Sequence, residues 1–113
     1  PLREFMWSED MADACVHILL SVSFADIVAA RGGCDIRNTH INIGTGNETS
    51  IAALAAMTAE TTGFRGRIEW DSSKPDGTMR KLCDVSRLHS LGWKHRVELP
   101  EGINRLYRWY CRN

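Results

Sequence analysis

Apolar side chains recur at helical spacing in the first part of the chain. The recurring positions are Met11, Ala14, Cys15, Ile18, Leu19 and Val22. Steps of three and four residues put them on one face, so the pattern predicts a helix over about 9–22, with Ser8 as its cap. Glu9 and Asp10 suit the positive end of its dipole. Residues 3–7 are typical of a short strand, and 23–38 show no clear period around a Gly32–Gly33 loop.

Three further helices are predicted from their end signals. Ser50 caps a helix that ends at Gly63, and the apolar face between them carries Ile51, Leu54, Ala55 and Thr58. A brief helix is capped by Asp84 and ends at Gly92. Pro100 suits the first turn of a last helix, because its missing N–H has no partner there in any case. The predicted buried stripe of that helix is Ile103, Leu106, Tyr107 and Tyr110.

Short strands are predicted at His40–Ile43 and Arg67–Trp70, and a turn at Lys74–Gly77. Together with about four helices, these elements indicate an α/β fold, a small mixed domain of short strands. They are too few and too short for a full doubly wound sheet.

Charge is balanced overall but unevenly distributed. Fourteen Lys and Arg match fourteen Asp and Glu, which argues against a general nucleic-acid binder with a net positive field. No apolar run approaches the roughly 20 residues of a membrane span. The first third is acidic, whereas a later basic stretch carries Lys74, Arg80, Lys81, Arg87, Lys94 and Arg96.

The residues that usually carry chemistry are scattered. Cys15, Cys34, Cys83 and Cys111 form no C-x-x-C pair, and the four histidines do not supply zinc-ligand spacing. Reduced thiols in a cytoplasmic protein are favoured over a disulfide framework, which the count alone leaves open. No G-x-S-x-G or S-x-x-K motif is present.

Two short motifs could bind phosphate. Gly44-Thr45-Gly46 begins like the dinucleotide fingerprint G-x-G-x-x-G, but Thr49 stands where the third glycine is needed. A tight turn is therefore favoured over a dinucleotide site. Arg80-Lys81 follows the Pro-Asp-Gly-Thr sequence and could hold a phosphate, the alternative being a solvated basic face.

Three stretches together resemble one enzyme family. They are the opening Pro1–Phe5 with Glu9–Ala14, the His40–Gly46 segment, and Asp71–Val85. The last reads S-K-P-D-G-T-x-R-K-L-x-D-V and narrows the resemblance to the GDP-L-fucose synthases, which are extended short-chain dehydrogenase/reductases. The resemblance covers essentially the whole chain. Met79 and Cys83 depart from the proline and leucine usual in the family.

The resemblance implies an NADP-dependent enzyme that makes GDP-L-fucose from GDP-4-dehydro-6-deoxy-D-mannose. Residues 1–113 would be its C-terminal substrate-binding region. The family's catalytic residues and NADP loop would lie in a Rossmann domain before Pro1. This chain alone is therefore expected to bind no cofactor or metal and to be inactive.

The resemblance also implies which residues bind substrate. Arg3 and Lys81 match residues that hold the GDP moiety, through its pyrophosphate. Arg67 matches a further substrate contact, and Asp76 would reach a ribose hydroxyl. The expected partner is the GDP-sugar, with no nucleic acid and no membrane.

The whole enzyme is expected to be a cytoplasmic homodimer. The isolated chain is expected to self-associate through an apolar face that includes the first helix. Two alternatives remain open: a fragment of another nucleotide-sugar epimerase or dehydratase, and a non-catalytic interaction module.

Overall fold

The computed structural model describes residues 1–33 and 36–113 and confirms a small α/β fold. In chain order its elements are β1 (Leu2–Arg3), α1 (Ser8–Ser21), α2 (Phe24–Ala30), β2 (Thr49–Ser50), α3 (Ile51–Thr62), β3 (Arg80–Lys81), α4 (Ser86–Ser90) and α5 (Leu99–Arg112). The described residues thus form five helices, one more than the pattern predicts.

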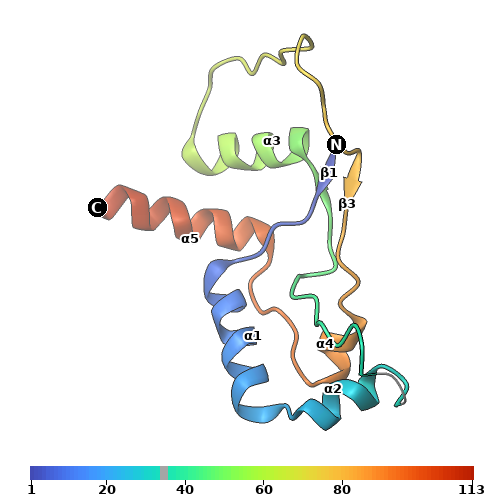
Figure 1. Ribbon diagram of the computed structural model, residues 1–113. Helices are drawn as coiled ribbons and strands as arrows, with labels where there is room; N and C mark the ends of the chain where they lie inside the picture. The colour runs from blue at the N-terminus through green and yellow to red at the C-terminus, as the bar shows by residue number, and fades with distance from the viewer. Residues whose placement is uncertain (34–35) are drawn as a thin grey trace.

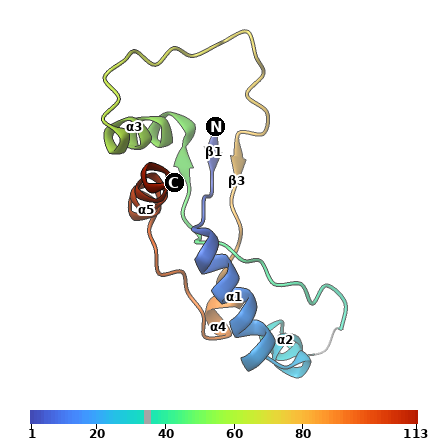
Figure 2. The ribbon, with the colours of Figure 1, turned by 90° about the vertical axis from the view of Figure 1, so that its left-hand side faces the viewer.

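The strands form one small sheet in the order β2-β1-β3. The central strand β1 is antiparallel to β2 and parallel to β3. Helices α3 and α5 lie toward one end of the molecule, and α1, α2 and α4 lie toward the other (Figure 1). The connection from α3 to β3 arches away from the body in both views (Figure 2).

The molecule is elongated and flat, with extents of 55 × 36 × 18 Å. Its radius of gyration is 17.7 Å, whereas a compact domain of this length has one of about 13 Å. The core is correspondingly small. Its central cluster is Ala14, Leu88 and Trp93, against which Met6, Ile18, Ile41 and Ile43 pack.

Several helix ends follow the predicted local signals. The Ser50 hydroxyl accepts a hydrogen bond from the Ala53 amide at 3.0 Å, and Gly63 ends α3 in the left-handed conformation. Pro100 lies in the first turn of α5. The Asp84 carboxylate accepts from the Ser86 amide at 3.0 Å, although Val85 is the residue at the cap position of α4.

Two predictions about the first helices are wrong. Ser8 does not cap α1, because it is the first helical residue and Trp7 precedes it without a side-chain cap. The region after α1 contains a further helix, α2, which the weak apolar period concealed. A capping box starts α2: the Ser23 hydroxyl accepts from the Asp26 amide, and the Asp26 carboxylate accepts from the Ser23 amide.

The predicted strands are largely wrong. Only Arg3 of 3–7 is in a strand, and neither His40–Ile43 nor Arg67–Trp70 forms one. Ile41 and Ile43 are apolar because they pack on the core cluster rather than because they join a sheet. The segment 67–70 lies exposed in the arch, with no neighbouring strand in the described part of the chain.

Two smaller predictions also need correction. The turn expected at Lys74–Gly77 lies earlier, where the Lys74 amide donates to the Asp71 carbonyl at 3.4 Å. In the expected α5 stripe, Ile103 and Tyr107 are half-buried, but Leu106 and Tyr110 are exposed. These two side chains have too little neighbouring structure to cover them.

Within the described residues, no individual helix has both the length and the apolar character needed to cross a membrane. The bent pair α1 and α2, at 109° to each other, meets those two criteria only when taken together.

Candidate functional site

The sheet brings together two basic residues that are far apart in the sequence. Arg3 of β1 pairs with Lys81 of β3 and, on its other side, with Thr49 of β2. Paired residues on adjacent strands carry their side chains on the same face, with the strands about 4.8 Å apart. One face of the sheet therefore carries a row of two cations and a hydroxyl, which we call the Thr49–Arg3–Lys81 row.

The cations of this row are available for a ligand to different degrees. One guanidinium nitrogen of Arg3 donates to the Leu2 carbonyl at 2.7 Å. A Cβ added to Gly77 would lie 3.9 Å from the other terminal nitrogen, so that glycine borders the Arg3 head group. Lys81 is exposed, and no acid pairs with it among residues 1–33 and 36–113.

The neighbouring base, Arg80, is already neutralised. Adjacent strand residues point to opposite faces, so Arg80 lies on the other face from Lys81. There its Nε donates to Glu48 Oε2 at 2.7 Å. The Glu48 carboxylate raises the pKa of Arg80, first through this hydrogen bond and then through its charge. Of the Arg80-Lys81 pair, Lys81 is thus the side chain with an uncompensated charge.

The two other expected substrate residues lie in the arch between α3 and β3. Asp76 is exposed and immediately precedes Gly77, which borders Arg3. Arg67 is also exposed, and it forms an ion pair with Glu69. The structure therefore places Asp76 near the row along the chain, whereas among the described residues Arg67 pairs with Glu69 and not with the row.

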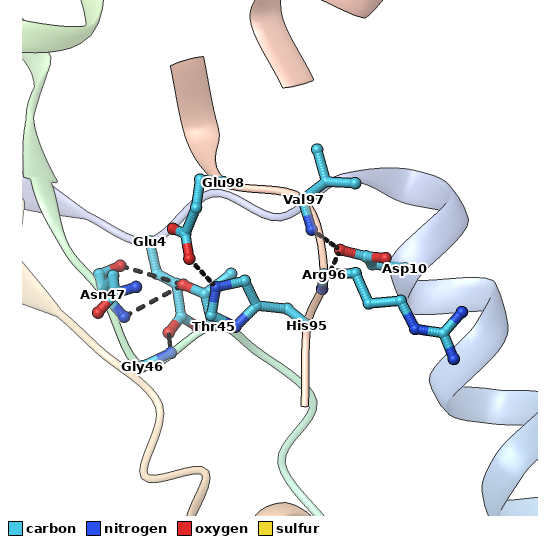
Figure 3. A network of polar contacts seen from close by, with 9 residues as sticks. All are labelled: Glu4, Asp10, Thr45, Gly46, Asn47, His95, Arg96, Val97 and Glu98. Carbon is cyan, nitrogen blue, oxygen red and sulfur yellow. Dashed lines mark hydrogen bonds and ion pairs between the residues drawn. The ribbon is translucent and has the colours of Figure 1, made fainter. Parts of the chain in front are cut away.

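The Gly44-Thr45-Gly46 turn holds a carboxylate of the protein itself. Glu4 Oε2 accepts a hydrogen bond from the Gly46 amide at 2.8 Å (Figure 3). A Cβ on Gly44 would overlap the Glu4 carboxylate, which explains the glycine at this position. The Thr45 hydroxyl accepts from the Asn47 amide at 3.1 Å and tightens the turn. A phosphate could not take the same place while Glu4 occupies it.

The same carboxylate reaches the segment that follows β3. The Cys83 thiol lies within the influence of the Glu4 carboxylate. Burial raises the pKa of this thiol most, and the hydrogen bond and the negative charge of Glu4 raise it further. Glu4 therefore bonds to the glycine turn and influences the thiol just beyond Lys81.

A second acid joins α1 to the segment that leads into α5. Asp10 is buried in the first turn of α1, and its Oδ2 accepts from the amides of Arg96 at 3.0 Å and Val97 at 2.8 Å (Figure 3). Nearby, His95 Nε2 lies 2.8 Å from Glu98 Oε1. Asp10 thus binds backbone groups as well as facing the helix dipole.

A small cleft borders the row at Thr49. Its volume is about 210 Å³, below the roughly 300–1,000 Å³ of sites that enclose a whole ligand. Its lining includes Phe5, Asn47, Thr49, Met57 and Pro100. A ligand held by the row could place only part of itself here.

The cysteines that the structure describes form no disulfide. Cys15, Cys83 and Cys111 are free thiols, and Cys34 lies outside the described residues. No group of three metal-ligating side chains comes together in the part of the chain that the structure describes.

The sequence reasoning missed Glu4 and Asp10 as organising residues. Both are acids whose carboxylates accept backbone amides from segments distant in the chain. One signal for Glu4 was available: the glycine turn has no basic residue of its own, and Glu4 is an acid within the predicted strand 3–7. Asp10 looked like an ordinary first-turn acid.

Comparison with known proteins connects this architecture to a family. The chain is 44% identical over its whole length to GDP-L-fucose synthase 1 of Arabidopsis thaliana, of which it covers 31%. It is 42% identical to the GDP-L-fucose synthase of Escherichia coli K12, of which it covers 34%. No protein-family model matches. The chain spans about a third of the length of these curated relatives.

Solved structures of GDP-sugar enzymes are similar to this chain as well. A GDP-D-glycero-L-gluco-heptose synthase of Campylobacter jejuni, crystallised in the presence of NADPH, superposes with a TM-score of 0.86. The match is 40% identical and covers 97% of this chain and 30% of that one. A C. jejuni GDP-6-OMe-4-keto-L-xylo-heptose reductase gives a TM-score of 0.87 at 43% identity, covering 99% and 32%. Sequence and fold together confirm the resemblance: the chain belongs to the extended short-chain dehydrogenase/reductases, in the group of GDP-L-fucose synthases and related GDP-sugar reductases, and corresponds to their C-terminal part.

Proposed function

We propose that this chain binds the nucleotide end of a GDP-sugar, and that the Thr49–Arg3–Lys81 row holds its pyrophosphate. The supporting observation is the pairing of Arg3 with Lys81 on adjacent parallel strands. An arginine fork binds phosphate oxygens in a bidentate manner, and a lysine adds a point charge. Two cations at strand spacing match the two linked phosphates of GDP, and Thr49 adds a hydroxyl donor.

Two residues of the arch would add weaker contacts. Asp76 precedes the glycine that borders Arg3, so its carboxylate is suited to accept from a ribose hydroxyl. Arg67 would have to exchange its ion pair with Glu69 for a substrate group. Because this pair is exposed, such an exchange costs about 1 kcal/mol or less. Arg67 would therefore bind substrate only after its ion pair with Glu69 has opened.

For the whole protein we propose the activity of its relatives: NADP-dependent epimerisation and reduction of GDP-4-dehydro-6-deoxy-D-mannose to GDP-L-fucose. A ketone at C4 acidifies the C–H bonds at C3 and C5, so one acid–base site can invert both centres before C4 is reduced. We assign this chemistry, and NADP, to a Rossmann domain outside residues 1–113. The glycine turn of this chain does not suit a dinucleotide, because Glu4 fills it. The chain alone is then inactive, and it holds the nucleotide so that the sugar is positioned.

The similarity to heptose enzymes favours a second substrate. Two superposed structures are a GDP-heptose synthase and a GDP-heptose reductase, at 40% and 43% identity. Both substrate classes share the GDP group, so the role of the row is the same for either. Specificity for the sugar would be determined by residues outside the row.

We further propose that the exposed face of α1 is a contact surface. Val16, Leu19 and Leu20 are exposed, whereas Ala14 is buried, and Leu19 is 81% exposed although its spacing predicts the same face as Ala14. The total accessible surface is 8228 Å², whereas a compact protein of this mass exposes about 6,200 Å². This excess of surface, taken over the whole molecule, is larger than the roughly 800 Å² that each partner buries in a stable interface. The isolated chain is expected to cover this face by self-association, and the complete cytoplasmic enzyme is proposed to be a homodimer.

The nucleotide proposal is tested by titrating the chain with GDP while recording backbone amide NMR signals. Binding should shift the amides of β1 and β3, and Lys81→Ala should weaken the affinity about tenfold, as expected for a charge-assisted phosphate contact. Lys74→Ala is the matched control, since Lys74 is an exposed base in the arch. GDP binding that is no tighter than millimolar and is unaffected by Lys81→Ala would favour a non-catalytic interaction module instead.

A further inference from the structure

Three segments meet at the carboxylate of Glu4. Glu4 directly follows Arg3, the last residue of β1. Its Oε2 accepts from the Gly46 amide at 2.8 Å. Its carboxylate also raises the pKa of the Cys83 thiol, two residues beyond Lys81. The Glu4 side chain follows Arg3 in the sequence, and its carboxylate acts on a residue close to Lys81.

We propose that Glu4 is a positioning residue for the nucleotide site: it locks β1 to the glycine turn, which packs against Val85 beyond β3, and so sets the placement of Arg3 beside Lys81. This inference rests on the proposed binding of GDP by the row. Glu4 itself would not contact the nucleotide.

The sheet needs such a lock because its strands are very short. Each of β1, β2 and β3 has two residues, whereas strands in globular proteins usually have about five or six. Outside the strands' own pairing, one backbone bond spans β1 and the residue before β3, from the Leu2 amide to the Met79 carbonyl at 2.8 Å. A carboxylate that accepts a backbone amide forms a charge-assisted bond, about twice as strong as a neutral one.

The sign of the charge separates this role from a direct electrostatic one. A carboxylate beside Arg3 repels the pyrophosphate, so if Glu4 acted only through its field, its removal would strengthen GDP binding. A positioning role predicts the opposite, because the two cations would lose their fixed separation. One substitution therefore distinguishes the two roles.

The decisive comparison is between Glu4→Gln and Glu48→Gln in the GDP titration. Both remove one negative charge near the sheet and keep the side chain's size, but Glu48 pairs with Arg80 on the opposite face. Glu4→Gln should weaken GDP binding about fivefold and Glu4→Ala about twentyfold, since a charge-assisted bond is lost in part or entirely. Glu48→Gln should bind GDP as well as the unchanged chain or better. Equal or tighter binding by Glu4→Gln would overturn the proposal.

A second readout needs no nucleotide. Glu4→Gln removes two of the causes that raise the Cys83 pKa, so alkylation of Cys83 by iodoacetamide should begin at lower pH. Exposed Cys15 in the same sample is the internal control. The Leu2 amide should also exchange its proton faster. If Glu4→Gln alters neither the pH profile of Cys83 alkylation nor the exchange rate of the Leu2 amide, the lock is refuted. If the chain without any substitution binds no GDP, the proposed function is refuted instead.

Discussion

Arg3 and Lys81 stand opposite each other on adjacent parallel strands, with Thr49 completing the row on the other side of Arg3. This pairing turns two basic residues from distant segments into one candidate phosphate site. The surrounding structure supports this pairing through a small core, the carboxylates of Glu4 and Asp10, and well-defined helix ends. Each of these supports gives a prediction of its own.

Leu88→Ala should test the core most strongly. Leu88 is fully buried in the cluster with Ala14 and Trp93, so the substitution removes apolar contacts and leaves a cavity. The free energy of unfolding should fall by about 3 kcal/mol, measured by urea denaturation. Leu106→Ala on exposed α5 should change it by about 0.5 kcal/mol or less. Similar losses in the two variants would show that the cluster is not the stabilising core.

Asp10→Ala should separate α1 from the segment leading into α5. Asp10 accepts the amides of Arg96 and Val97, and both amides would lose their partner. We expect a loss of about 3 kcal/mol in unfolding free energy, from two bonds to a charged acceptor. The control Glu9→Ala removes an exposed acid from the same helical turn and should cost about 1 kcal/mol or less. A loss no greater than that of the control would contradict the bridging role.

The capping box of α2 should make its end sensitive to acid. Hydrogen bonds from the backbone amide and then the hydroxyl of Ser23 lower the pKa of Asp26. A lowered carboxyl pKa means that the cap is intact above the unfolded-state pKa and is lost as the pH falls through the folded-state value. NMR titration should therefore find Asp26 below the ordinary range for aspartate. Ser23→Ala should raise its pKa toward that range, and an Asp26 that titrates normally in the unchanged chain would argue against the box.

The α1 face should drive self-association of the isolated chain. Sedimentation velocity should show a larger species that grows with chain concentration. Leu20→Glu should shift the population to monomer, because a charge cannot be buried in an apolar contact without a partner. Thr62→Glu adds the same charge on exposed α3 and should leave association unchanged. A monomer at all concentrations would show that this face does not pair with a second copy.

Helix ends proved readable from sequence because their signals are local. Ser50, Gly63 and Pro100 act on backbone groups within a few residues, and each lies where its chemistry predicts. Strands depend on partners elsewhere in the chain. Ile41 and Ile43 have strand-like apolar patterning but pack on the core instead.

The candidate site shows the same division. The resemblance to GDP-L-fucose synthases pointed to Arg3 and Lys81 individually, but their register is a property of the sheet. Glu4 could not be recognised as a lock, because its amide partner, Gly46, lies in a turn whose position relative to β1 is set by tertiary structure. Arg67 was expected beside the substrate, and the structure instead pairs it with Glu69 in the arch, which keeps its role a proposal.

Binding of phosphate groups by the Thr49–Arg3–Lys81 row is tested most directly by comparing ligands that carry phosphate with ligands that lack it. The affinities of the chain for GDP and for guanosine should be measured before and after Lys81→Ala. We predict that the substitution weakens GDP binding about tenfold, as for one charge-assisted contact, and leaves guanosine binding unchanged. An equal loss for both ligands, or no loss for GDP, would contradict the assignment of Arg3 and Lys81 to the pyrophosphate.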